Sequence, residues 1–184
     1  MPIFGAWRAE RQLQERADRY VAALLGEPAA ADVDWLAATA TRGDRDHAAW
    51  ELRYARRALG LVTAQRDALD DRTGAVVAHT LTAAFERDPH IDPDRVELAQ
   101  RQFNDRLGAY RDAIGARVTA ATPERLGRTL LAFSGGSFRD RDAGVIRAGE
   151  LLSQYLLSAN ESLRQAFGQA SLPENVPPSA LLKR

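Results

Sequence analysis

The residues most able to take part in chemistry are the three histidines, because imidazole suits acid–base catalysis and metal binding near neutral pH. His47 precedes Glu51 by four positions, so both side chains would share one face of a helix. Helical di-iron sites require Glu-x-x-His on two helices, and the sequence contains no such pattern. We therefore expect His47 at the edge of the core. A ligand site or active centre near His47, Glu51 and Arg53 is the alternative.

A second group with metal-binding side chains lies in one short turn. Asp88, His90, Asp92 and Asp94 fall within seven residues. A calcium loop of the EF-hand type would also need a central glycine and a closing glutamate, and this segment has two prolines and no glycine. Asp92 followed by Pro93 instead predicts the start of a helix, with the aspartate as N-cap and proline at the first position.

Arginines gather in the segment after His47. Arg53, Arg56 and Arg57 could bind a phosphate or an acidic protein surface. Glu51 and Asp67 belong to the same predicted helix, so we expect much of this charge to be solvated or held in internal ion pairs. The three arginines remain candidate contacts for a partner.

The residue types needed for most other chemistry are missing. The chain has no cysteine, which excludes disulfides, thiolate catalysis and cysteine-ligated metals. No Gly-x-Ser-x-Gly motif is present, and the Ser134–Ser137 loop lacks the Lys-Ser/Thr pair of a nucleotide-binding P-loop. The sequence therefore predicts no catalytic residue, no metal and no cofactor.

Composition narrows the classes of partner. The 184 residues include 25 Lys and Arg and 25 Asp and Glu, giving a formal net charge of zero. Nucleic-acid binders usually carry a basic excess, so we expect no nucleic-acid partner. Zero net charge also permits self-association, because copies repel one another little at long range. With neither a secretory signal nor about 18 consecutive apolar residues, the expected location is cytoplasmic.

Helical spacing of apolar residues runs through almost the whole chain, and no segment alternates as a strand would. The sequence predicts a single-domain, all-α bundle of about five to seven helices over residues 1–170. Prolines predict a non-helical tail over 171–184. The expected helices cover 3–25, 32–41, 46–68, 70–87, 92–121, 122–133 and about 140–167. Whether the chain breaks at Asp70-Asp71 or continues as one helix is left open.

Both ends carry apolar residues whose partners the sequence does not reveal. Ile3, Phe4 and Trp7 precede any expected packing partner, and Leu181 and Leu182 follow the prolines of the tail. Facing outward, they would suit a partner or a membrane surface; facing inward, they would belong to the core. Either end could also pack on the chain itself.

These observations support three hypotheses. The first is a non-enzymatic helical interaction or assembly module, either a homo-oligomer or a subunit of a larger complex. The second is a small-molecule-binding bundle or an enzyme whose polar groups meet near His47, Glu51 and Arg53. The third is peripheral membrane association through the N-terminal amphipathic helix.

Overall fold

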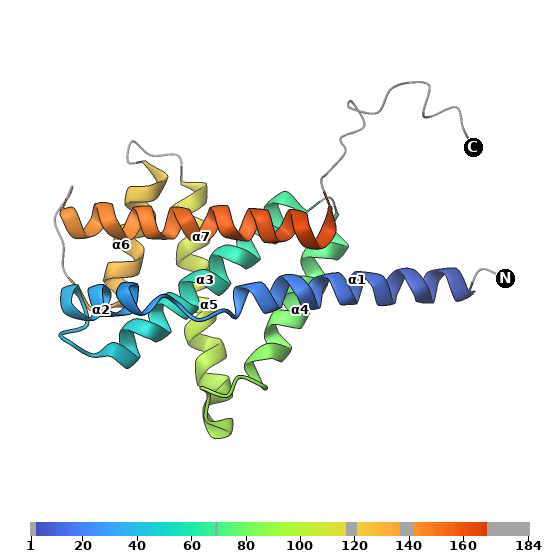
Figure 1. Ribbon diagram of the computed structural model, residues 1–184, viewed down its shortest axis with the longest axis horizontal. Helices are drawn as coiled ribbons and strands as arrows, with labels where there is room; N and C mark the ends of the chain where they lie inside the picture. The colour runs from blue at the N-terminus through green and yellow to red at the C-terminus, as the bar shows by residue number, and fades with distance from the viewer. Residues whose placement is uncertain (1–2, 69, 117–120, 137–141, 169–184) are drawn as a thin grey trace.

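The computed structural model describes residues 3–68, 70–116, 121–136 and 142–168 (Figure 1). Within these ranges the chain forms seven α-helices, a short 3-10 helix and no strand, which confirms the all-α prediction. The elements are α1 (Ile3–Leu24), α2 (Ala30–Thr39), α3 (Arg45–Asp67), α4 (Asp71–Phe85), η1 (Pro93–Arg95), α5 (Val96–Gly115), α6 (Thr122–Phe133) and α7 (Ala143–Phe167). None of the helices in the described ranges is long and apolar enough to cross a membrane.

Helix α3 forms the centre of the bundle. It packs against α2, α4, α5 and α7, and most of its length from Ala48 to Ala64 is buried. In Figure 1, α1 and α7 run antiparallel along the long axis, and α4, α5 and α6 cross them steeply. Because neighbours cover α3 on several sides, even charged positions of this helix lie inside the protein.

Aspartates define the starts of three helices. The carboxylate of Asp44 accepts from the His47 backbone N–H, and that of Asp142 accepts from the Gly144 N–H. Asp70 accepts from the Thr73 N–H at 2.6 Å and so caps α4. The open question at Asp70-Asp71 is thereby answered: α3 ends at Asp67 and a separate helix begins, because the cap satisfies a backbone donor there.

Two other helices begin without a side-chain cap, although Asp32 and Thr122 stand where the sequence predicts these helices to start. Helix α2 begins at Ala30, so Asp32 lies in its first turn, where its charge favours the helix dipole. Thr122 is the first residue of α6 and does not cap it, and Pro123 follows, where a backbone N–H is not needed.

The helix predicted from Asp92 to Ala121 is shorter and begins differently. Asp92 caps the 3-10 turn Pro93–Arg95, and α5 follows as far as Gly115. Residues 117–120 lie outside the described part of the chain.

Helices α6 and α7 approach closely through glycines. A β-carbon on Gly127 would lie 2.2 Å from the Val145 carbonyl oxygen, and one on Gly149 would lie 2.3 Å from that of Pro123. Neither backbone can move away easily, so this close contact requires glycine, which has no side chain, at both positions.

Helix α1 packs against α4 and α7, and its residues Ala17, Tyr20, Val21 and Leu24 are buried. Tyr20 also donates a hydrogen bond to the Gly60 carbonyl of α3 at 2.8 Å. Its N-terminal part extends beyond the ends of α4 and α7 (Figure 1). Residues 7–12 of α1 are exposed.

Candidate functional site

The exposed part of α1 carries one large apolar side chain. Trp7 is 60% exposed, and the Arg11 guanidinium lies 5.9 Å from the centre of its ring. Arg11 in turn donates a hydrogen bond to Glu15 at 2.9 Å. No residue outside α1, in the part of the chain that the structure describes, forms a ring or cation contact with the indole. The candidate side chain Trp7 therefore faces solvent.

Contacts of α1 with α4 begin within this exposed segment, about one helical turn after Trp7. Glu10 forms an ion pair with Arg72 at the start of α4. One turn further on, the Gln14 side-chain amide donates to the Thr80 hydroxyl and to the Asp18 carboxylate, both at 2.9 Å. These bonds hold α1 against α4 and leave the segment before Glu10 extending past the bundle.

A groove of about 400 Å³ continues between the same two helices. We call it the α1/α4 groove. Its lining comes from the C-terminal part of α1, from α4 and the loop after it, and from one arginine of α3. The lining residues are Asp18, Val21, Ala22, Leu25, Glu27, Arg57, Thr80, Ala84, Arg87, Asp88, Pro89 and His90.

The structure brings His47 and Glu51 together, as their spacing predicted, and adds a third residue. Arg106 of α5 donates to both carboxylate oxygens of Glu51, at 2.5 and 3.0 Å, and His47 Nε2 lies 3.4 Å from one of them. Glu51 is 2% exposed. The Arg106 guanidinium occupies both carboxylate oxygens, so this arrangement supports α3–α5 packing better than it supports contact with a ligand.

Sequence reasoning missed Arg106, although a signal for it existed. Arg106 lies three residues after Phe103 and four before Tyr110, which puts it on the buried face of α5. Its guanidinium lies 4.4 Å from the centre of the Phe133 ring and 5.3 Å from that of Tyr54. A charge at an inward position of a helix predicts an opposite charge on the helix it faces.

The three arginines of α3 diverge and contact separate partners. Arg53 donates to the Glu27 carboxylate at 2.7 and 3.2 Å, and Arg57 donates to that of Asp88 at 2.6 Å. Arg56 donates to the Gly26 carbonyl at 3.3 Å and lies over the Tyr155 ring. Since Arg57 is only 2% exposed, these residues form internal links to two loops in place of one basic surface.

Trp50 stands at the centre of these links. The guanidinium groups of Arg53 and Arg57 lie 5.0 and 5.9 Å from the centre of its ring, and the Tyr54 ring centre lies 5.3 Å away. Burial raises the pKa of Tyr54 to about 12, so its hydroxyl stays protonated and donates to Gln102. The groups around α3 are thus donors and cations that mostly have partners, but Nε and Nη1 of the buried Arg57 guanidinium have no hydrogen-bond partner among the described residues.

The acidic turn from Asp88 to Asp94 has structural roles. Asp88 holds Arg57 and accepts from the His90 backbone N–H at 3.0 Å, and Asp92 caps η1. The His90 ring lies 3.2 Å from Glu27. Within the described residues no three His, Cys, Asp or Glu side chains are arranged to hold a metal ion.

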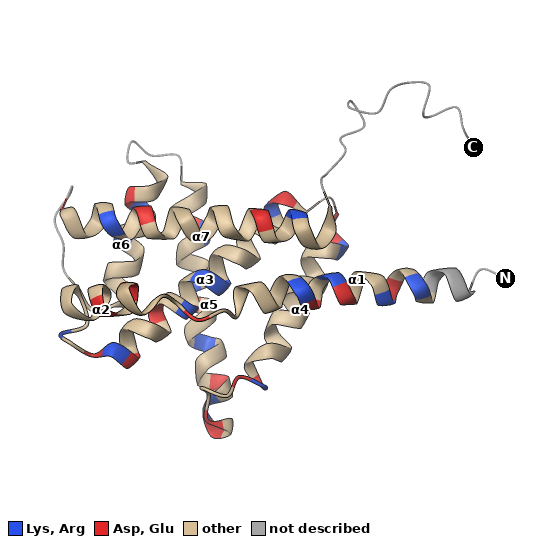
Figure 2. Ribbon diagram, viewed as in Figure 1, with Lys and Arg blue, Asp and Glu red and all other residues tan. Residues whose placement is uncertain are grey.

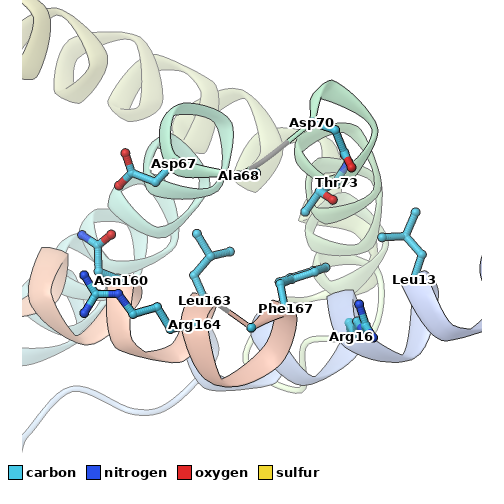
Figure 3. Close-up of a pocket in the computed structure, with 11 residues that line it drawn as sticks. Leu13, Arg16, Asp67, Ala68, Asp70, Thr73, Asn160, Leu163, Arg164 and Phe167 are labelled. Atoms are coloured by element: carbon cyan, nitrogen blue, oxygen red, sulfur yellow. The ribbon is translucent and has the colours of Figure 1, made fainter. Parts of the chain in front are cut away.

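A larger cavity, of about 670 Å³, lies where the C-terminal end of α7 meets α1 and the turn between α3 and α4 (Figure 3). Leu163 and Phe167 of α7 line it together with Leu13 and Arg16 of α1. Figure 3 shows Asp67 and Asp70 on the opposite side, at the ends of α3 and α4. The lining carries both signs of charge, and Asp70 is already occupied as a helix cap.

Four candidate residues at the ends of the chain have no described side-chain environment. Ile3 and Phe4 belong to α1, but their side chains lie outside the description. Leu181 and Leu182 belong to the tail, which is outside the described residues altogether.

Comparison with known proteins gives no relative. No family model, curated protein or solved structure matches the chain.

Proposed function

We propose that this protein is a non-enzymatic helical assembly module, and that it binds a second copy of itself through the N-terminal part of α1. The observation that carries the proposal is the Trp7 side chain, 60% exposed on a helical segment that extends past the bundle. Burying a large apolar side chain stabilises a complex by about 1.5–3 kcal/mol. A tryptophan on an extended helix is therefore a strong potential anchor for association.

Other exposed apolar residues differ from Trp7 in their setting. Leu98 of α5 and Ile146 and Leu157 of α7 are also exposed, but both helices pack against α3 and α6. Single apolar residues of this kind are common on protein surfaces. Trp7 is distinguished because its helix has turns without a covering element in the described chain.

The charge pattern of α1 favours a second copy as the partner. Arginines and acidic residues alternate along the helix (Figure 2). A surface that carries both signs of charge can pair with an antiparallel copy of itself. Because the formal net charge of the chain is zero, long-range repulsion between two copies is weak.

The same pattern argues against the membrane hypothesis. Amphipathic helices that bind anionic lipids carry mainly Lys and Arg on the polar face. In α1 the arginines are interspersed with Glu10, Glu15 and Asp18. The ligand or enzyme hypothesis near His47, Glu51 and Arg53 is also less well supported, since Arg106 and Glu27 already pair with the two charged groups.

The experiment is a measurement of molar mass by sedimentation and light scattering over a wide range of protein concentration. The wild-type chain is expected to form dimers, and Trp7→Ala, which removes two indoles from each dimer, to weaken it by about 3 kcal/mol, more than about a hundredfold in Kd. Leu157→Ala is the matched control, since Leu157 is 70% exposed on α7 and should leave the dimer unchanged. A wild-type chain that stays monomeric at every concentration would contradict the proposal.

A further inference from the structure

The exposed indole and the α1/α4 groove lie along the same face of α1. Positions 7, 11, 14, 18, 21 and 25 repeat at intervals of three and four residues, so they form one stripe on the helix. Asp18, Val21 and Leu25 of this stripe line the groove, and Gln14 bonds Thr80 at its edge. The stripe therefore leads from the groove directly to Trp7.

Trp7 cannot fill the groove of its own chain. Ala22, at the centre of the α1 wall, lies fifteen positions after Trp7, which is about 22 Å along a helix rising 1.5 Å per residue. Both are on one continuous helix, so no rotation of side chains brings them together. An indole that enters the groove must come from another molecule.

The groove has the size and lining that such a side chain needs. Its volume of about 400 Å³ lies within the range of about 300–1,000 Å³ that is typical of pockets for small molecules. Val21, Ala22, Leu25, Ala84 and Pro89 provide apolar surface, and the rest of the lining is polar or charged. Ala22 is exposed, so the α1 wall is open to an approaching helix.

We propose, on the basis of the self-association above, that the α1/α4 groove receives Trp7 of a second copy. Two copies related by a two-fold axis would exchange these contacts, so that each supplies one indole and one groove. The α1 helices then run antiparallel, with Trp7 of one copy opposite Ala22 of the other.

This register also pairs opposite charges. From the Trp7–Ala22 contact, four residues toward the C-terminus of one α1 run beside four residues toward the N-terminus of the other. This places Arg11 opposite Asp18 of the second copy. Both residues lie on the stripe and both side chains are exposed. The indole and the groove alone define the register, so the charge complementarity is an independent reason for a second copy as the occupant.

Disulfide trapping tests the register sharply, because the natural chain has no cysteine. Arg11→Cys and Asp18→Cys are made in separate chains with different affinity tags, mixed and oxidised. The mixture is expected to give a cross-linked pair that carries both tags. Each variant alone is the control: in the dimer, position 11 of one copy lies about 10 Å along the helix from position 11 of the other, beyond the reach of a disulfide.

A second pair of variants tests the groove without changing Trp7. Ala22→Arg places a long charged side chain in the groove and is expected to abolish both the dimer and the mixed cross-link. Ala38→Arg, on an exposed position of α2, is the matched control and should retain both. Circular dichroism checks that each variant keeps its helices.

The outcomes separate the two proposals. A dimer without the mixed cross-link, or one that survives Ala22→Arg, would overturn the groove contact and leave self-association standing. Efficient cross-linking of Arg11→Cys with itself would overturn it equally, since it would indicate another register. A chain that is monomeric at all concentrations would overturn both.

Discussion

The centre of the bundle around α3 and the N-terminal part of α1 differ in where their partners lie. Around α3, Glu51 is paired with Arg106 and Arg57 with Asp88, and the members of each pair are more than thirty positions apart in sequence. On α1, Trp7 remains 60% exposed beside Arg11 of its own helix. The charged groups that could have formed a reactive site are paired inside the protein, whereas the apolar Trp7 side chain is exposed. Charge clusters therefore point to packing here, whereas the exposed indole points to association.

The strongest way to test the internal role of the charges is to remove Arg106. Arg106→Ala leaves Glu51 buried without its cation, and the free energy of unfolding is expected to fall by about 3–5 kcal/mol. Urea denaturation followed by circular dichroism measures the loss. Arg11→Ala removes an exposed ion pair to Glu15 and should cost less than about 1 kcal/mol. An equal loss of unfolding free energy in the two variants would contradict the difference proposed between the two regions.

A smaller loss is expected where α6 meets α7. Gly127→Ala places a methyl group against the Val145 carbonyl and should destabilise the protein by about 1–3 kcal/mol. Gly108→Ala on α5 is the matched control, because nothing lies within 4 Å of its new β-carbon. It should stabilise the protein by about 0.5–1 kcal/mol, since alanine favours helix. Thermal unfolding of both variants gives the comparison, and a stabilising Gly127→Ala would show that the contact is looser than the structure has it.

Acid should weaken the link between α3 and the loop after α4. Burial acts to raise the pKa of Asp88, but hydrogen bonds from the His90 backbone N–H and the Arg57 side chain outweigh it and lower that pKa. The pair therefore stabilises the protein fully above about pH 4, near the pKa of an aspartate in an unfolded chain. This stabilisation is lost as the pH falls through the lower pKa that Asp88 has in the folded protein.

In Asp88→Asn this part of the acid dependence should disappear, and urea midpoints measured across the acid range would show a flatter curve. Glu27→Gln should flatten it less. The hydrogen bond from Arg53 lowers the pKa of Glu27, but that side chain is 56% exposed and water screens the pair. An unchanged acid curve in Asp88→Asn would contradict the assignment.

The smallest effect on folding is expected at the residue with the largest effect on association. Trp7→Ala should change the free energy of unfolding of the monomer by no more than about 0.5 kcal/mol, because the indole is mostly exposed. The measurement is made in the Ala22→Arg background, so that dissociation does not contribute. A large destabilisation would mean that Trp7 belongs to the core of its own chain.

Much of the helix content could be predicted from the sequence. Apolar residues at spacings of three and four positions predicted the helices, and Asp92-Pro93 predicted the start of η1, because these signals depend on neighbours in the chain. Boundaries that depend on small free-energy differences were less certain. Asp32 and Thr122 have the right side chains for caps, yet both lie inside their helices.

The partners of individual side chains were decided by the tertiary structure. His47 and Glu51 share a helix face through local geometry, so their contact was predictable, but Arg106 is 55 positions from Glu51 and meets it only because α5 packs on α3. For the arginines of α3 the sequence predicted solvation or internal ion pairs, with acidic residues available on the same helix. The pairs that form are with Glu27 and Asp88 on two separate loops, because neighbours cover several sides of α3. Likewise, sequence identified Trp7 as apolar, and only the arrangement of α4 and α7 left it exposed. The spacing of apolar residues shows which face of each helix is buried. Which helices cover that face depends on how complete helix surfaces fit together, and that information is distributed over the entire chain.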